Sequence, residues 1–157
     1  MKNSVQILDL VPVASEWVEG QENFILSNGV MLNATQTYLA SKIGIVEIEK
    51  IRLLKVDKIP SPVNSILSLA VSNLGLITEN TIGITFRHGI YIRSEYWKND
   101  SLLIHELTHT MQYERLGGIC NFLNQYIKEC IYFGYNKSPL EIEAREMESK
   151  IILNKFI

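Results

Sequence analysis

Two histidines and one glutamate in a short apolar stretch carry the clearest chemistry in this sequence. His105, Glu106 and His109 form the pattern H-E-x-x-H within residues 102–111, where Glu106 is the only acidic or basic residue apart from the histidines. Residues at i and i+4 share one face of a helix, with Cβ atoms roughly 5–6 Å apart, so both imidazoles can bind one ion. Zinc binds histidine nitrogen at about 2.0–2.1 Å. The spacing therefore predicts a zinc site.

Glu106 directly follows the first histidine, so it is expected to lie beside the ion rather than on it. Zinc lowers the pKa of water to about 7, and a neighbouring carboxylate can accept that proton and later pass it to a leaving amine. The alternative is an ordinary buried helix whose histidines are satisfied by hydrogen bonds in the core. Two observations argue against an ordinary buried helix. The motif uses two of only three histidines, and burying a carboxylate without a partner costs free energy. We expect Glu106 to be the catalytic acid and base.

A third ligand has to come from elsewhere, because catalytic zinc sites usually have three protein ligands and one open position. The best downstream carboxylates are Glu141 and Glu143, within residues 138–146. Ser138, Pro139 and Glu141 also match a capping box, in which Glu141 would reach back to the amide of Ser138. The apolar stripe of the expected helix has one glutamate on each flank, so periodicity does not decide between them.

H-E-x-x-H followed by a later helix with E-x-E-A resembles the zincin metallopeptidases of the glutamate-ligand type, the gluzincins. The chain is similar in particular to bacterial metallopeptidase domains of unknown role. The resemblance is specific over the motif helix, looser over residues 138–145, and topological elsewhere. It implies that His105, His109 and Glu141 bind Zn²⁺, that Glu106 is catalytic, and that the substrate is a peptide or protein.

The sequence departs from this family at one position. Relatives often carry an aspartate four residues after the ligand glutamate, where it accepts a hydrogen bond from a ligand histidine and fixes its tautomer. This chain has Arg145 there, and arginine has no acceptor. The role must fall to another carboxylate or to a backbone carbonyl.

Further residues are weighed as accessory groups, and none of them enters the predicted site. His88 lies in an expected hairpin turn, where a histidine is usually solvated. Tyr113 and Tyr135 could donate to a developing oxyanion, or could be packing residues. In zincin-like folds an edge strand beside the active helix pairs with an extended peptide, and residues 82–93 are the candidate here.

These groups must be positioned by a small α+β fold. We predict one compact zincin-like domain over residues 1–157, with an irregular N-terminal segment over residues 1–23. A small sheet precedes the H-E-x-x-H helix, which is followed by a C-terminal helix bearing the glutamate. Helices are expected over residues 33–43, 61–75, 99–117, 119–131 and 138–151, and strands over 48–56, 82–86 and 90–93.

Composition limits the partners and the compartment. The chain has 157 residues, of which 46% are hydrophobic, and 15 basic against 17 acidic residues give a net charge of −2. Without a basic run, nucleic acid is not an expected partner. No apolar run reaches the ~18 residues of a membrane span, and the N-terminus is a poor signal peptide. Cys120 and Cys130 lie too far apart on one helix to bridge, which suggests reduced core thiols of a cytoplasmic protein. Export by a route without a cleaved leader stays open.

Two functions follow from these patterns. The first is a zinc-dependent peptidase that hydrolyses peptide bonds with Glu106 as general acid and base. The second is a non-enzymatic zincin-shaped module, which acts as a binding or regulatory domain or as cargo of a larger bacterial assembly. An unrestrained protease would threaten its own cell, so a narrow specificity or a regulatory partner protein would reconcile the two.

Overall fold

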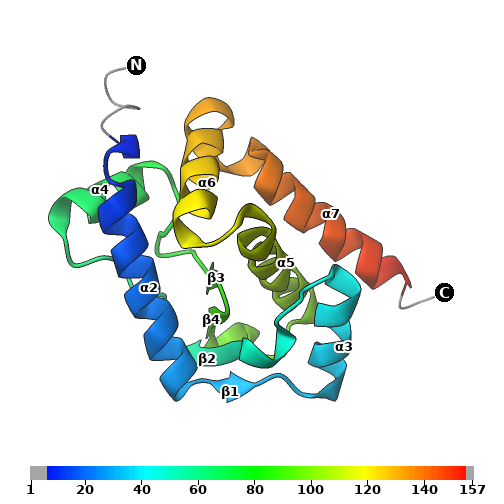
Figure 1. Ribbon diagram of the computed structural model, residues 1–157. Coiled ribbons are helices and arrows are strands. Elements are labelled where there is room, and N and C mark those ends of the chain that lie inside the picture. The colour runs from blue at the N-terminus through cyan, green and yellow to red at the C-terminus, as the bar shows by residue number, and fades with distance from the viewer. Residues whose placement is uncertain (1–6, 155–157) are drawn as a thin grey trace.

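The computed structural model describes residues 7–154, which form an α+β domain with helices on both faces of a small sheet (Figure 1). Helix α2 runs from Val11 to Asn28, so the irregular segment expected over residues 1–23 is wrong from Val11 onward. Residues 1–6 lie outside the described part. Pro12 lies in the first turn of α2, where its fixed φ and missing N–H suit a helix rather than break it.

The sheet has four strands in the order β1-β2-β4-β3. The central pair, β2 and β4, is parallel, and both outer pairs are antiparallel. Strand β3 therefore lies at one edge of the sheet, next to β4 and in contact with the motif helix. The strand bounds are Val30–Met31 for β1, Arg52–Val56 for β2, Gly83–Phe86 for β3 and Gly89–Arg93 for β4.

The hairpin predicted around His88 is confirmed, because Arg87 and His88 join β3 and β4. Arg87 adopts a positive φ of 57°, as one residue of such a tight turn often must. The strand predicted over residues 48–56 is shorter than expected. Residues Ile48–Lys50 form a 3₁₀ helix, η1, and β2 begins only at Arg52.

Asparagine side chains start the next two helices. Helix α3, Ala34–Ile43, follows a capping box built on Asn33, and it ends at Gly44 with φ of 100°. Helix α4, Ser65–Asn73, begins after Asn64, whose side chain accepts two backbone amides of the first turn. It starts later than the predicted serine-proline pair, because Asn64 caps its first turn while residues 61 and 62 lie outside any helix.

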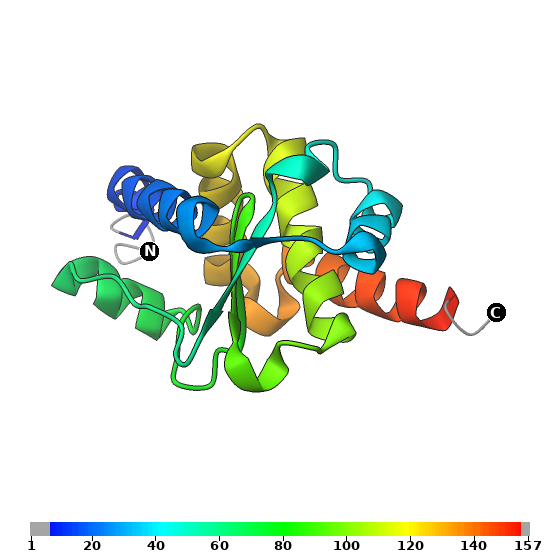
Figure 2. The same cartoon turned by 90° about the horizontal axis from the view of Figure 1, so that it is seen from below.

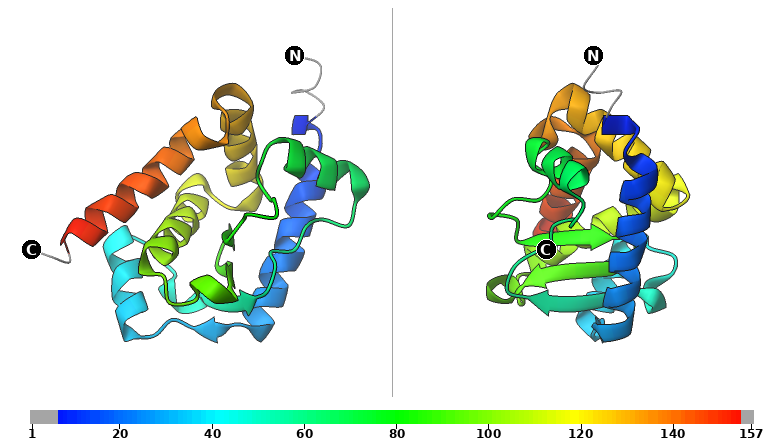
Figure 3. Two further views of the ribbon diagram at one scale, coloured as in Figure 1. Left: turned by 180° about the vertical axis from the view of Figure 1, so that it is seen from behind. Right: turned by 90° about the vertical axis from the view of Figure 1, so that its left-hand side faces the viewer.

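The motif helix, α5, runs over Asp100–Leu116 as predicted. The side chain of Asn99 accepts a backbone amide of its first turn, and Gly117 ends it with φ of 95°, where glycine has no steric penalty. Helix α6, Ile119–Phe133, turns back against α5. Helix α7, Pro139–Asn154, lies along α5 and carries the candidate glutamates (Figures 1 and 3).

Successive side chains of β4 point to opposite faces of the sheet and join the core on each face. Ile90 and Ile92 are buried against α3 and α5, where they contact residues such as Ile104. Tyr91 points to the other face and joins Ile25 of α2 in a second core cluster. Viewed from below, the sheet lies between α2 and α5 (Figure 2). The motif helix is thus packed on the sheet along one side, and α3, α6 and α7 also pack against it.

Two expectations about the surroundings of the chain can be compared with the fold. The cysteines are free thiols, and Cys130 is buried, but Cys120 is exposed. The expectation of a core thiol is wrong for Cys120, because it lies on the outer face of α6. None of the helices within residues 7–154 combines the length and the apolar character needed to cross a membrane.

Candidate metal centre

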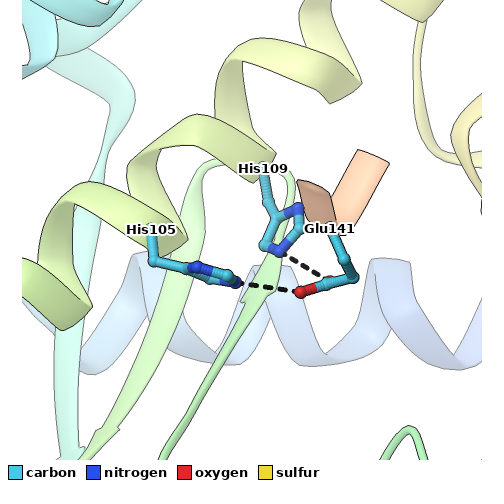
Figure 4. A group of neighbouring side chains, drawn as sticks. All are labelled: His105, His109 and Glu141. Atoms are coloured by element: carbon cyan, nitrogen blue, oxygen red, sulfur yellow. Dashed lines mark hydrogen bonds and ion pairs between the residues drawn. The ribbon is translucent and has the colours of Figure 1, made fainter. Parts of the chain in front are cut away.

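The histidines of the motif and one glutamate of α7 meet in the buried angle between their helices. The Nε2 atom of His105 lies 3.0 Å from Oε1 of Glu141, and the Nε2 atom of His109 lies 3.0 Å from Oε2 of the same carboxylate (Figure 4). The candidate ligand atoms all lie within 4.8 Å of one another. Both rings thus turn their Nε2 atoms toward one point, as the helical spacing predicts.

The structure also separates the two rival glutamates. Glu141 is 1% exposed and both of its oxygens face the histidines. Glu143 instead forms hydrogen bonds with Arg115 and Gln112, away from the cluster. The capping-box alternative for Glu141 is wrong, because its two carboxylate oxygens contact the imidazoles of His105 and His109 and not the amide of Ser138. The hydroxyl of Ser138 donates to a backbone carbonyl of the preceding turn.

Each histidine has an acceptor behind it. The Nδ1 atom of His105 lies 3.1 Å from Oε2 of Glu148, and the Nδ1 atom of His109 lies 2.8 Å from Oε1 of Gln112. An acceptor at Nδ1 favours a proton on that nitrogen and leaves Nε2 as the ligand atom. Glu148 therefore takes the role that Arg145 cannot, and the Arg145 guanidinium donates to a backbone carbonyl instead.

The charges of this cluster favour a cation. Burial alone would lower the pKa of His105, but the hydrogen bond to Glu141 and the charge of Glu106 outweigh it and raise that pKa to about 9. The pKa of His109 is raised against burial by Glu141 as well. Burial would raise the pKa of Glu141, and the two histidines hold it well below its usual range. Two imidazole nitrogens and one carboxylate are the donor set of many catalytic zinc sites, so these residues fit the ion.

Glu106 is buried beside the cluster and does not belong to it. The hydroxyl of Thr85 on β3 donates to Oε2 of Glu106 over 2.7 Å. A Cβ atom at Gly83 would lie 3.3 Å from Oε1 of Glu106 and 3.2 Å from Cδ1 of Leu102. The glycine thus lets the edge strand approach the carboxylate closely, and the threonine fixes the orientation of that carboxylate. This placement agrees with a side chain that reacts rather than binds the ion.

Two hollows adjoin the cluster, an apolar cavity and a more open hollow with several polar side chains in its lining. The cavity has a volume of ≈ 120 Å³ and is enclosed mainly by apolar residues of α2, α4, α6 and β3, with His109 and Glu141 at one end. The hollow has a volume of ≈ 470 Å³, and His105 is among the residues that line it. Glu106 and Tyr135 line both spaces, so a molecule bound across the cluster would contact these two side chains.

The sequence did not reveal the role of one tyrosine. Tyr126 of α6 donates its hydroxyl to Oε2 of Glu141 over 2.7 Å, although its helical period indicated only an apolar packing residue. No local signal could have found it, because its partner lies in another helix. Tyr113, weighed as an oxyanion donor, stacks on Phe122 and donates to the carbonyl of Thr85, so it is a packing residue.

The third histidine is not solvated as expected. His88 is 4% exposed, and its Nε2 atom lies 3.0 Å from Oε2 of Glu114. The expectation is wrong because the hairpin turn is covered by α2 and by the end of α5, where Glu22 and Glu114 surround the ring. His88 does not belong to the cluster on His105 and His109.

Comparisons of the chain with protein-family models, with curated proteins and with solved structures found no match. The function of the candidate metal centre therefore has to be inferred from the side chains that form it.

Proposed function

We propose that this protein is a zinc-dependent peptidase. The observation that carries the proposal is the convergence of Glu141 from α7 on the paired histidines of α5, with both Nε2 distances at 3.0 Å. A helix with two stray histidines would not need a buried carboxylate from a distant segment at that point. Nor would a purely structural zinc site need Glu106, which is 5% exposed and sits next to the ligands.

The residues divide into those that hold the ion and those that handle protons. His105, His109 and Glu141 would hold zinc, which supplies a Lewis acid that polarises a carbonyl and acidifies water. Glu106 accepts the proton of the attacking water and passes it to the leaving amine. Because Thr85 donates to Oε2 of this carboxylate, Oε1 is the atom left to accept the proton.

The surroundings of the site suit an extended peptide. Strand β3 is one of the two edge strands of the described sheet, and Gly83 at its start lines the open hollow beside His105. An edge strand can bind a substrate by backbone hydrogen bonds. The apolar cavity, which Glu106 also lines, would take an apolar side chain next to the cleaved bond. We therefore propose a peptide or protein substrate with a preference for apolar residues.

Metal analysis combined with proteomic cleavage profiling of the parent and Glu106→Gln proteins tests this function. We expect both proteins to bind the same amount of zinc, and only the parent to generate new peptide termini. Glu146→Gln, which alters an exposed glutamate of α7, should cleave like the parent. Equal cleavage by Glu106→Gln and the parent would refute the assignment. Zinc binding without any cleavage would instead favour the non-enzymatic alternative, a binding or regulatory module or a cargo domain.

A further inference from the structure

A second cluster of possible metal ligands lies at the far end of α5. Its members are Glu47 before η1, His88 in the β3–β4 turn and Glu114 in the last turn of α5, and their candidate ligand atoms lie within 4.8 Å of one another. The Nε2 atom of His88 is 3.0 Å from Oε2 of Glu114 and 3.8 Å from Oε2 of Glu47. Three segments that are distant in sequence thus direct one nitrogen and two carboxylate oxygens toward one point.

The groups behind these side chains hold them in place. Glu114 accepts the backbone amide of Val46 at Oε1 over 2.8 Å and that of Glu47 at Oε2 over 3.0 Å. On the other side of the ring, Nδ1 of His88 faces Oε2 of Glu22 at 3.7 Å. Glu22 is 1% exposed. At that distance Nδ1 of His88 and Oε2 of Glu22 are beyond hydrogen-bonding range, so Glu22 places a negative charge near the ring without a direct bond to Nδ1.

Glu22 is itself fixed and neutralised. The guanidinium of Arg87 donates to Oε1 over 2.7 Å, and the backbone amide of His88 donates to Oε2 over 2.9 Å. Its charge is therefore balanced by Arg87 and does not have to be balanced by the imidazole. The carboxylates that face Nε2 of His88 are those of Glu47 and Glu114. Lys50 pairs with Oε1 of Glu47 at 2.7 Å and leaves Oε2 free.

A proton on Nε2 of His88 does not account for this arrangement as well as a metal ion does. It can bond to Glu114, but Oε2 of Glu47, at 3.8 Å, is out of hydrogen-bonding range. Two ligands at about 2.0–2.1 Å from one tetrahedral ion are separated by roughly 3.3 Å. The separations of 3.0 and 3.8 Å lie on either side of that value. An open hollow of ≈ 810 Å³ beside the three side chains leaves room for water ligands.

We propose that Glu47, His88 and Glu114 form a second binding site for a divalent transition metal. One imidazole and two carboxylates suit Zn²⁺, Mn²⁺ or Fe²⁺ better than Ca²⁺, which prefers oxygen ligands alone. Such an ion ties the β3–β4 turn to the end of α5 and to the segment before β2. Helix α5 and the β3–β4 hairpin also carry the side chains of the candidate metal centre and of Thr85. The second ion therefore stabilises the elements that position that centre. Binding to the folded chain alone also raises its melting temperature.

The number of metal ions bound by matched variants tests the site. Each protein is stripped with a chelator, titrated separately with Zn²⁺ and Mn²⁺, freed of loose metal by gel filtration and analysed by mass spectrometry. For whichever ion binds, we expect Glu47→Ala to hold one equivalent fewer than the parent. Glu49→Ala is the control, because it removes the same charge from the same segment and lines the same hollow without belonging to the cluster. It should keep the full content.

The result does not depend on the first site. Glu141→Ala should lose one equivalent, and the double variant with Glu47→Ala should lose two. His88→Gln should behave as Glu47→Ala does. If His88→Gln fails to fold because its ring is buried, Glu47→Ala still decides, since the side chain of Glu47 is 44% exposed. Equal metal content in the parent, Glu47→Ala and Glu49→Ala would overturn the second site, whether or not the protein cleaves peptides.

Discussion

Glu148 lies behind His105, with its Oε2 atom 3.1 Å from Nδ1 of the imidazole. It follows Glu141 by seven residues, which is about two helical turns, and it also accepts the hydroxyl of Ser101. One helix therefore supplies both a candidate ligand and the carboxylate that orients another. This arrangement replaces the aspartate expected at the position of Arg145.

We expect Glu148→Gln to weaken zinc binding by about 10–100-fold, as loss of a carboxylate behind a ligand histidine usually does. Competition with a chromophoric chelator measures the change. Glu146→Gln on the exposed side of α7 should bind zinc like the parent. An unchanged affinity in Glu148→Gln would show that the backbone alone holds the ring of His105.

The choice between the two candidate glutamates gives a second prediction. Glu141→Gln removes a buried carboxylate from the pair of imidazoles, so zinc affinity should fall by more than about tenfold. Glu143→Gln removes an ion pair with Arg115 that is partly exposed, and such pairs contribute about 0–1 kcal/mol to stability. Its zinc affinity should stay within about twofold of the parent. If calorimetry gave the opposite ranking, Glu143 would be the ligand.

Gly83→Ala should lower turnover while zinc content stays the same. The added methyl group would lie 3.3 Å from Cγ and Oε1 of Glu106, so the carboxylate has to shift by a few tenths of an ångström. A shift of 1 Å at a reacting group can cost about 100-fold in rate, and we expect a loss of about tenfold here. Gly20→Ala is the control. It lies in the middle of α2 with nothing within 4 Å of the new Cβ, and should leave kcat unchanged.

The apolar cavity gives a prediction about specificity. Ala70 of α4 lines the cavity, whereas Ser72 of the same helix is exposed and does not. Ala70→Phe should fill part of the ≈ 120 Å³ and shift cleavage from large toward small apolar residues beside the cleaved bond. Ser72→Phe should leave the preference unchanged. An identical cleavage profile for Ala70→Phe would mean that the cavity does not receive the substrate.

The sequence predicted the parts that local patterns determine. Asn99 and Gly117 bound the motif helix as expected, since capping depends on residues close in sequence. The positions of Tyr126 and His88 depend on contacts between distant segments, so neither helical period nor turn chemistry could place them. Helix α2 was not among the predicted helices, although proline in a first turn, where Pro12 lies, is favourable.

The same distinction applies to the candidate metal centre. The i, i+4 spacing predicted that His105 and His109 share a face, because that follows from helix geometry alone. The choice of Glu141 rested on resemblance, since periodicity left both glutamates open. The packing of α7 on α5 distinguishes the two glutamates. It turns the flank with Glu141 toward the histidines, whereas Glu143 pairs with Arg115.

Acid should destabilise the protein through Glu22. Burial would raise the pKa of this carboxyl, but hydrogen bonds from His88 and Arg87 outweigh it and lower the pKa from 4.5 to about 2. Since the folded pKa is depressed, the stabilisation by Glu22 is fully present above pH 4.5 and is lost as pH falls toward 2. A shift of this size corresponds to a free energy on the order of 3 kcal/mol.

Urea denaturation of chelator-treated protein measures this effect. Glu22→Gln should be less stable than the parent at pH 7, and the gap between the two should shrink at pH 3, where the parent has lost part of the contribution of Glu22. Glu16→Gln, an exposed position on the same helix, should follow the parent at both pH values. A gap of the same size at pH 7 and pH 3 would mean that Glu22 stabilises the hairpin turn by packing and not through its charge.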